Sequence, residues 1–129
     1  MQIEFKDGLL FASIQISFRG CTKVIENMVI DTGAAESIIS PDAVEDIGIF
    51  AESEDSVNSF YGVGGSLHNF FSKDVGEIKL GQVRLEEVKM DFGVIDPKGS
   101  INGLLGLDLL MKLGAVLDLK RLSLTLDAP

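Results

Sequence analysis

The sequence is divided into many short apolar runs, and glycine or another turn-forming residue ends most of them. Several runs alternate apolar and polar residues, as Leu122, Leu124 and Leu126 do near the C-terminus. This alternation is typical of half-buried β-strands, whereas an amphipathic helix repeats its apolar positions about every 3.6 residues. The 14 glycines supply turns between such strands. The pattern therefore predicts an all-β chain.

The predicted strands follow one another closely along the chain. Those in the first third cover residues 2–6, 9–18, 23–30 and 37–39, and the last two lie on either side of Lys120-Arg121. Pro41 opens a polar helical turn that Gly48 closes. The acidic run at 51–55 is expected to be a solvated connection, because runs of like charge usually face water.

Two further features are predicted in the second half. The apolar phase changes between Val83-Leu85 and Val88-Met90, which predicts a β-bulge near Glu86-Glu87. A short helix is predicted from Gly106 to Leu113, because an acidic residue follows its start and Gly114 follows its end.

Length and charge limit the classes of protein to which the chain can belong. Its 129 residues suffice for one hydrophobic core but not for two, so residues 1–129 are expected to form a single domain. Charged residues interrupt the longest apolar stretch, so no membrane span is predicted. The net charge of -9, without a basic stripe, argues against nucleic acid as a partner. A single cysteine and a start without a secretory signal predict a cytoplasmic location.

The inventory of reactive side chains is small. His68 and Cys21 are the only imidazole and thiol in the sequence. Nucleophilic triads and most metal sites need several such groups, so no metal or cofactor is expected. His68 is interpreted as a surface or strand residue, and Cys21 as a buried or turn thiol.

The most informative segment is Asn27–Ser40, which reads NMVIDTGAAESIIS. Here an apolar strand runs directly into Asp31-Thr32-Gly33. A carboxylate at the end of a buried strand must find hydrogen bonds or a partner, because a charge that leaves water is otherwise costly. Thr32 offers a hydroxyl, and Gly33 lets another chain approach the backbone closely.

Paired carboxylates can hydrolyse a bond without a metal. Two aspartates about 3 Å apart cannot both ionise, so one acts as a base and the other as an acid. The sequence contains one Asp-Thr-Gly, so a pair of this kind requires a second copy of the chain. A two-fold symmetric homodimer supplies that copy.

Three motifs together resemble the retropepsin-like aspartic proteases, the single-domain dimeric relatives of pepsin. They are DTGAAES at 31–37, GVGG at 62–65 and INGLLGLDLL at 101–110. The likeness covers about residues 23–126 and is greatest to the protease domain of the DNA-damage-inducible, ubiquitin-linked retropepsins and to small bacterial relatives. It implies a closed, barrel-like all-β monomer with one short C-terminal helix. It also implies a homodimeric aspartic endopeptidase that acts on peptides or proteins.

The resemblance also implies roles for individual residues. Asp31 would be the catalytic aspartate, Thr32 would bond across the dimer axis, and Gly33 would contact the substrate backbone, with Ala34 next to it. The flap that closes over the peptide would consist of Tyr61, Gly62, Val63, Gly64 and Gly65. Tyr61 is equally compatible with an ordinary cross-strand aromatic contact.

The sequence departs from the retroviral pattern at two positions. Ala35 stands where those enzymes usually carry an aspartate, and Leu107 where they carry an arginine, so their ion pair is absent. Glu36 either reaches a substrate side chain or faces solvent. Apolar substrate pockets are expected, because the neighbouring positions are small or apolar. These positions are Ala34, Ala35, Val63, Leu104 and Leu105.

Two other interpretations remain open at the level of sequence. The chain can be a non-catalytic module that holds peptides or forms dimers, or an acidic structural domain in which Asp31 only caps a turn. The terminal strands, residues 2–6 and 122–126, are candidates for the dimer interface.

Overall fold

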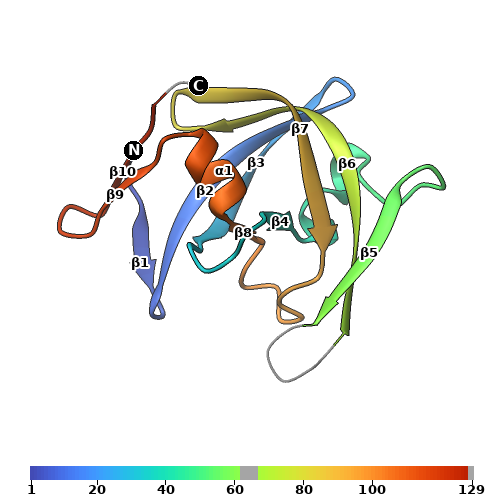
Figure 1. Ribbon diagram of the computed structural model, residues 1–129, viewed down its shortest axis with the longest axis horizontal. Helices are drawn as coiled ribbons and strands as arrows, with labels where there is room; N and C mark the ends of the chain where they lie inside the picture. The colour runs from blue at the N-terminus through green and yellow to red at the C-terminus, as the bar shows by residue number, and fades with distance from the viewer. Residues whose placement is uncertain (62–66, 128–129) are drawn as a thin grey trace.

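The computed structural model describes residues 1–61 and 67–127, which are mostly β-structure (Figure 1). The strands are β1 (Glu4–Lys6), β2 (Leu9–Phe18), β3 (Cys21–Ile30), β4 (Ile38–Ile39), β5 (Ser56–Tyr61), β6 (Leu67–Leu80), β7 (Val83–Gly93), β8 (Gly103–Leu105), β9 (Val116–Asp118) and β10 (Ser123–Thr125). The described helical elements are α1 (Leu107–Lys112) and the 3-10 turns η1 (Pro41–Ala43) and η2 (Glu45–Ile47). The predicted all-β class with a short C-terminal helix is confirmed. No described helix is long and apolar enough to cross a membrane.

Within the described ranges, eight strands form one sheet in the order β1-β2-β3-β8-β4-β7-β6-β5. β2 also pairs with β6, so the sheet curls back on itself (Figure 1). β1 and β5 stay at its edges, so the ring is not the clean closed barrel that was predicted. β9 and β10 form a separate hairpin. A bridge between Gln2 and Ser123 joins this hairpin to the N-terminal segment, which lies beside β10 (Figure 1).

The core lies inside the curled sheet, and the alternation of apolar residues explains how it forms. In β2, Ala12, Ile14, Ile16 and Phe18 are buried on one face. Helix α1 adds Leu109 and Leu110 to the same cluster, and Gly114 follows the helix in a left-handed conformation with a φ of 54°. Burial of each large aliphatic side chain contributes about 1.5–3 kcal/mol, so the core anchors both the sheet and the helix.

The predicted bulge near Glu86-Glu87 is wrong. β6 and β7 keep one register from Phe70↔Gly93 to Leu80↔Val83, so no residue is inserted at that point. Instead, Glu87 adopts a φ of 52° opposite Gly76, and the buried positions change phase in both strands there. Beyond this point, residues 77–79 of β6 pair with β2 on one edge while they stay paired with β7 on the other.

The acidic connection at 51–55 is not simply solvated, which corrects the prediction for two of its residues. Nζ of Lys73 lies 2.6 Å from Oε1 of Glu52 and 2.7 Å from Oδ2 of Asp55. The side chain of Lys73 is only 3% exposed, and that of Asp55 is 8% exposed. Arg19 adds a contact to Glu52 at 3.1 Å. These ion pairs fasten the connection to β6.

Candidate active site

The Asp31 loop, residues 31–36, begins directly after β3 and is held by main-chain hydrogen bonds. The Asp31 N–H donates to the carbonyl oxygen of Leu105 at 2.9 Å. Oδ1 of Asp31 accepts from the Gly33 N–H at 2.9 Å, and the Asp31 carbonyl accepts from the Ala34 N–H at 3.2 Å. These bonds set the direction of the Asp31 side chain at the strand end.

The strand order explains why this loop is enclosed on one side. β3 runs parallel to β8, with Ile30 opposite Leu105, and β4 pairs with the other edge of β8. The chain therefore leaves one edge of β8, forms the Asp31 loop, and returns on the opposite edge. Close pairing with β4 requires glycine at position 103, because an added Cβ would clash with the carbonyl oxygen of Ile38 in β4.

The start of α1 is bonded to the loop. The Leu107 N–H donates to the carbonyl oxygen of Ala34 at 2.9 Å, and the Asp108 N–H donates to that of Ala35 at 3.1 Å. A Cβ added at Gly106 would lie 2.7 Å from the carbonyl carbon and oxygen of Glu36, so this contact requires glycine. The loop and the helix thus form one hydrogen-bonded unit.

Ser37 links the same elements through its side chain and was not singled out from the sequence. Its buried hydroxyl donates to Oδ1 of Asp108 at 2.6 Å and accepts from the Gly106 N–H at 2.8 Å. Oδ1 of Asp108 also accepts from the N–H groups of Ser37 and Leu109. Asp108 was predicted only as a helix-start residue. A serine directly before an apolar strand was the available indication that its hydroxyl is buried.

The predicted catalytic residues Asp31, Thr32 and Gly33 form the first part of the loop and are all at least partly exposed. Asp31 and Ala34 are half-buried, whereas Thr32, Gly33, Ala35 and Glu36 are exposed in the single chain. The exposed Thr32-Gly33 backbone and the adjacent carboxyl group are therefore accessible to another molecule. The predicted flap residues Gly62 to Gly65 lie outside the described residues, as does the side chain of Tyr61, whose backbone ends β5.

A cavity of about 400 Å³ adjoins the loop. It brings together four of the predicted substrate-binding residues, which are Ala34, Ala35, Glu36 and Leu104. Leu105 does not line it, since its side chain is fully buried. Sequence reasoning missed Ile38, Phe70, Asp91 and Ile95, which complete much of the wall. Ile38 lies in β4 shortly after the loop, but Phe70, Asp91 and Ile95 come from distant parts of the chain, so no local pattern connects these three to Asp31.

Two carboxyl groups line this cavity. Asp91 is 6% exposed, and its Oδ1 accepts a hydrogen bond from the hydroxyl of Ser72 at 2.6 Å. A hydrogen bond with Asp91 and its negative charge raise the pKa of Glu36 above its usual value of 4.5. Glu36, which was predicted either to reach a substrate or to face solvent, is exposed and also lines the cavity.

A second cavity, of about 300 Å³, lies on the other side of the loop and is mostly apolar. Thr32, Leu107, Leu110 and Met111 contribute to its wall. Leu107 is the residue at the position where retroviral enzymes carry an arginine. In this chain its apolar side chain contributes to the wall of an apolar cavity.

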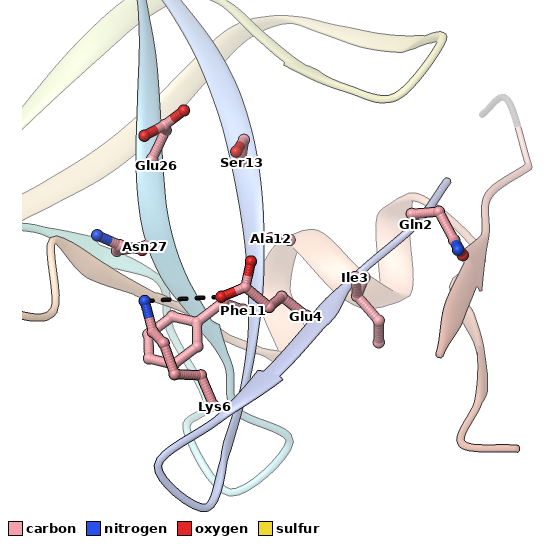
Figure 2. Close-up of a pocket in the computed structure, with 9 residues that line it drawn as sticks. All are labelled: Gln2, Ile3, Glu4, Lys6, Phe11, Ala12, Ser13, Glu26 and Asn27. Carbon is pink, nitrogen blue, oxygen red and sulfur yellow. Dashed lines mark ion pairs between the residues drawn. The ribbon is translucent and has the colours of Figure 1, made fainter. Parts of the chain in front are cut away.

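A larger cavity, of about 500 Å³, lies among the N-terminal strands (Figure 2). Lys6 forms an ion pair with Glu4 at 3.7 Å, and its Nζ lies 5.0 Å from the ring centre of Phe11. Asn27, in β3, also lines it (Figure 2). No residue of the Asp31 loop contributes to this cavity, so it is separate from the candidate site.

Comparison with known proteins agrees with this geometry. A family model described as aspartyl protease matches residues 14–109. No curated protein matches the chain.

Solved structures share the fold. A retropepsin-like aspartic protease from Rickettsia conorii is 18% identical, with a TM-score of 0.64, over 92% of this chain and 90% of that one. The EIAV protease, in complex with the inhibitor HBY-793, is 22% identical, with a TM-score of 0.63, over 90% and 98% of the two chains. The retroviral protease-like domain of Ddi1 from Leishmania major is 18% identical, with a TM-score of 0.64, over 92% and 88%.

Proposed function

Because the chain belongs to the aspartyl protease family, we propose that it is an aspartic endopeptidase that acts as a homodimer. Each subunit contributes one Asp31, and the active site lies on the two-fold axis between them. The observation that carries the proposal is the Asp31 loop, which main-chain bonds hold in place while Thr32 and Gly33 stay exposed. An isologous contact through this loop brings the two Asp31 carboxyl groups together.

The proposed chemistry uses the two Asp31 carboxyl groups and one water molecule. The ionised carboxylate takes a proton from the water, whose oxygen attacks the carbonyl carbon of the peptide. The protonated carboxyl group donates to the carbonyl oxygen as the tetrahedral intermediate forms. Transfer of a proton to the leaving nitrogen then breaks the C–N bond and releases an acid and an amine.

The neighbouring residues have proposed roles in assembly and substrate binding. Thr32 bonds to the partner loop across the axis, and Gly33 allows the substrate backbone to approach closely. Ala34, Ala35 and Leu104 form part of a substrate pocket, which their place in the 400 Å³ cavity supports. The segment from Tyr61 to Gly65 acts as a flap that excludes water from the site.

Cleavage of an unbiased peptide library tests the proposal. Wild type and Asp31→Asn are incubated with the library between pH 3.5 and 7.5, and the products are identified by mass spectrometry. Asp31→Asn removes the titrating group at nearly constant volume, so it is expected to abolish cleavage. Equal cleavage by both proteins would refute the catalytic role of Asp31, and no cleavage by either would favour a peptide-binding or dimerisation module.

Mixing the two proteins tests whether the site is shared. If each active dimer needs two intact Asp31 residues, activity falls with the square of the wild-type fraction after subunit exchange. A site within one subunit gives a linear fall instead. Sedimentation of the same mixtures verifies that dimers are present, and a strictly monomeric active species would refute the shared site.

A further inference from the structure

We propose that the cavity beside the Asp31 loop, which Glu36 and Asp91 line, is a subsite for a lysine or arginine side chain of the substrate. The proposal rests on the proposed function, because the cavity adjoins the loop that carries Asp31. It assigns Glu36 as a specificity-determining residue and names the class of peptide that the cleft prefers.

The walls of the cavity fit the stem of such a side chain. Ile38, Phe70, Ile95 and Leu104 provide apolar surface, and Ala34 and Ala35 leave room at the side of the loop. Lysine and arginine bury their methylene groups along apolar surfaces while their charged ends reach polar groups. A volume of about 400 Å³ is large enough for one long side chain.

The carboxyl groups of Glu36 and Asp91 fit the charged end of a lysine or arginine side chain. Asp91 is 6% exposed, so it is largely removed from water, and within the chain its Oδ1 receives the Ser72 hydroxyl. The Glu36 carboxyl group lies close enough to Asp91 for its pKa to be raised, but Glu36 remains exposed, so it is accessible to a ligand. Charge-assisted hydrogen bonds to carboxylates are about twice as strong as neutral ones, which favours a cationic occupant over an uncharged one.

Other charged groups near the pair do not cancel its negative charge. Nζ of Lys89 lies 3.6 Å from Oδ1 of Asp91, but the Lys89 side chain is 62% exposed, so water screens its charge. Asp108 lies close enough to raise the pKa of Glu36 further. The cavity wall itself carries two carboxyl groups, Glu36 and Asp91, near one lysine, so it keeps a net negative charge when both are ionised.

The preference of the subsite for a basic side chain is expected to depend on pH, because Glu36 must be ionised to attract it. Because the pKa of Glu36 is raised from 4.5, the group gains its charge over a pH range above that value. The preference for a basic side chain is therefore expected to increase as the pH rises from 4.5 to neutral. Asp91, Asp108 and Lys89 are the other titratable groups that act on Glu36.

The decisive experiment measures binding without cleavage. Asp31→Asn is titrated with a series of octapeptides in which each position in turn carries either lysine or its uncharged isostere norleucine. At one position lysine is expected to bind about tenfold more tightly, as one additional charge-assisted hydrogen bond implies. Equal binding of lysine and norleucine at every position would overturn the subsite.

Two charge variants in the Asp31→Asn background move the preference in opposite directions. Glu36→Gln removes one negative charge and is expected to reduce the lysine preference to about twofold or less. Lys89→Gln removes the competing cation and is expected to increase it. A matched control, Glu26→Gln, changes an exposed acid that does not line this cavity and should leave the preference unchanged.

The outcomes separate this proposal from the proposed function. If Glu36→Gln keeps the full lysine preference, or if Lys89→Gln lowers it, Glu36 and Asp91 do not select the side chain. If the wild-type protein cleaves peptides without any lysine preference, the subsite is refuted but the endopeptidase function is not. If the protein binds peptides with a lysine preference but never cleaves them, the subsite is supported and the endopeptidase function is refuted.

Discussion

The hydroxyl of Ser37 donates a hydrogen bond to the Asp108 carboxylate at 2.6 Å, and this bond joins the end of the Asp31 loop to the first turn of α1. The same hydroxyl accepts from the Gly106 N–H. Because Ser37 is buried, water cannot replace its hydroxyl as the partner of Asp108 and Gly106. A small polar side chain therefore holds together the two segments that shape the candidate site.

Replacement of this serine tests how much the link contributes. Ser37→Ala leaves the buried Gly106 N–H without its acceptor and removes one of three donors to Oδ1 of Asp108, so we expect a loss of about 1–3 kcal/mol in the free energy of unfolding. Urea denaturation measures this loss. Ser13→Ala, at an exposed position, serves as the control and should change stability by less than about 0.5 kcal/mol.

A methyl group at Gly106 tests the close approach of α1 to the loop. Gly106→Ala places a Cβ 2.7 Å from the Glu36 carbonyl, so the two segments must separate, and a destabilisation of about 1–3 kcal/mol is expected. Gly76→Ala is the matched control, because its Cβ meets Ser17 at an ordinary 3.5 Å. Similar denaturation midpoints for both variants would show that the approach is not tight.

The ion pairs of Lys73 predict a specific dependence of stability on pH. Hydrogen bonds from Lys73 hold the pKa values of Glu52 and Asp55 below their usual 4.5 and 3.8. A carboxyl group with a lowered pKa stabilises the fold above its unfolded pKa, and that contribution is lost as the pH falls through the folded value. Stability from these pairs is therefore complete near neutral pH and declines below about pH 4.

Removal of the lysine isolates this effect. Lys73→Met is expected to lower the melting temperature at pH 7, and the difference from wild type should shrink as the pH falls below 4. Thermal unfolding between pH 7 and 3 measures it. Lys98→Met, at an exposed position, is the control, and a difference that grows in acid would contradict the assignment.

Thr32 is expected to affect assembly more than folding. The residue is exposed in the single chain, so Thr32→Ala should leave the melting temperature of a monomer nearly unchanged. Loss of two symmetry-related hydrogen bonds, each worth about 1 kcal/mol, raises the dimer dissociation constant by roughly 30-fold. Sedimentation equilibrium measures that constant. Thr32→Ser keeps the hydroxyl and should dimerise almost like wild type, and the same weakening in both variants would exclude the bond.

Local patterns in the sequence were sufficient for some parts of the fold. The short helix and the strand that ends at Asp31 depend on neighbouring residues, and both lie where the sequence predicts them. The motifs also indicated the family, to which the match over residues 14–109 assigns the chain. The functional roles of Asp31, Thr32 and Gly33 stay predictions.

Other parts depend on contacts between distant segments. Lys73 finds its acidic partners about twenty positions earlier in the chain, and Asp91 joins Glu36 only because β7 pairs with β4. The phase change at Glu87 resembles a bulge in sequence, but a left-handed residue opposite Gly76 produces it without an insertion. The pattern of residues within one segment does not show which distant residues it will contact.

The way in which the Asp31 loop is fastened has a consequence for protein engineering. Main-chain atoms of Asp31, Ala34 and Ala35 make its bonds to β8 and α1, so most side chains of the loop are not needed to hold its shape. Positions 35 and 36 therefore tolerate exchange, and a library randomised at these two codons can retune selectivity without rebuilding the scaffold.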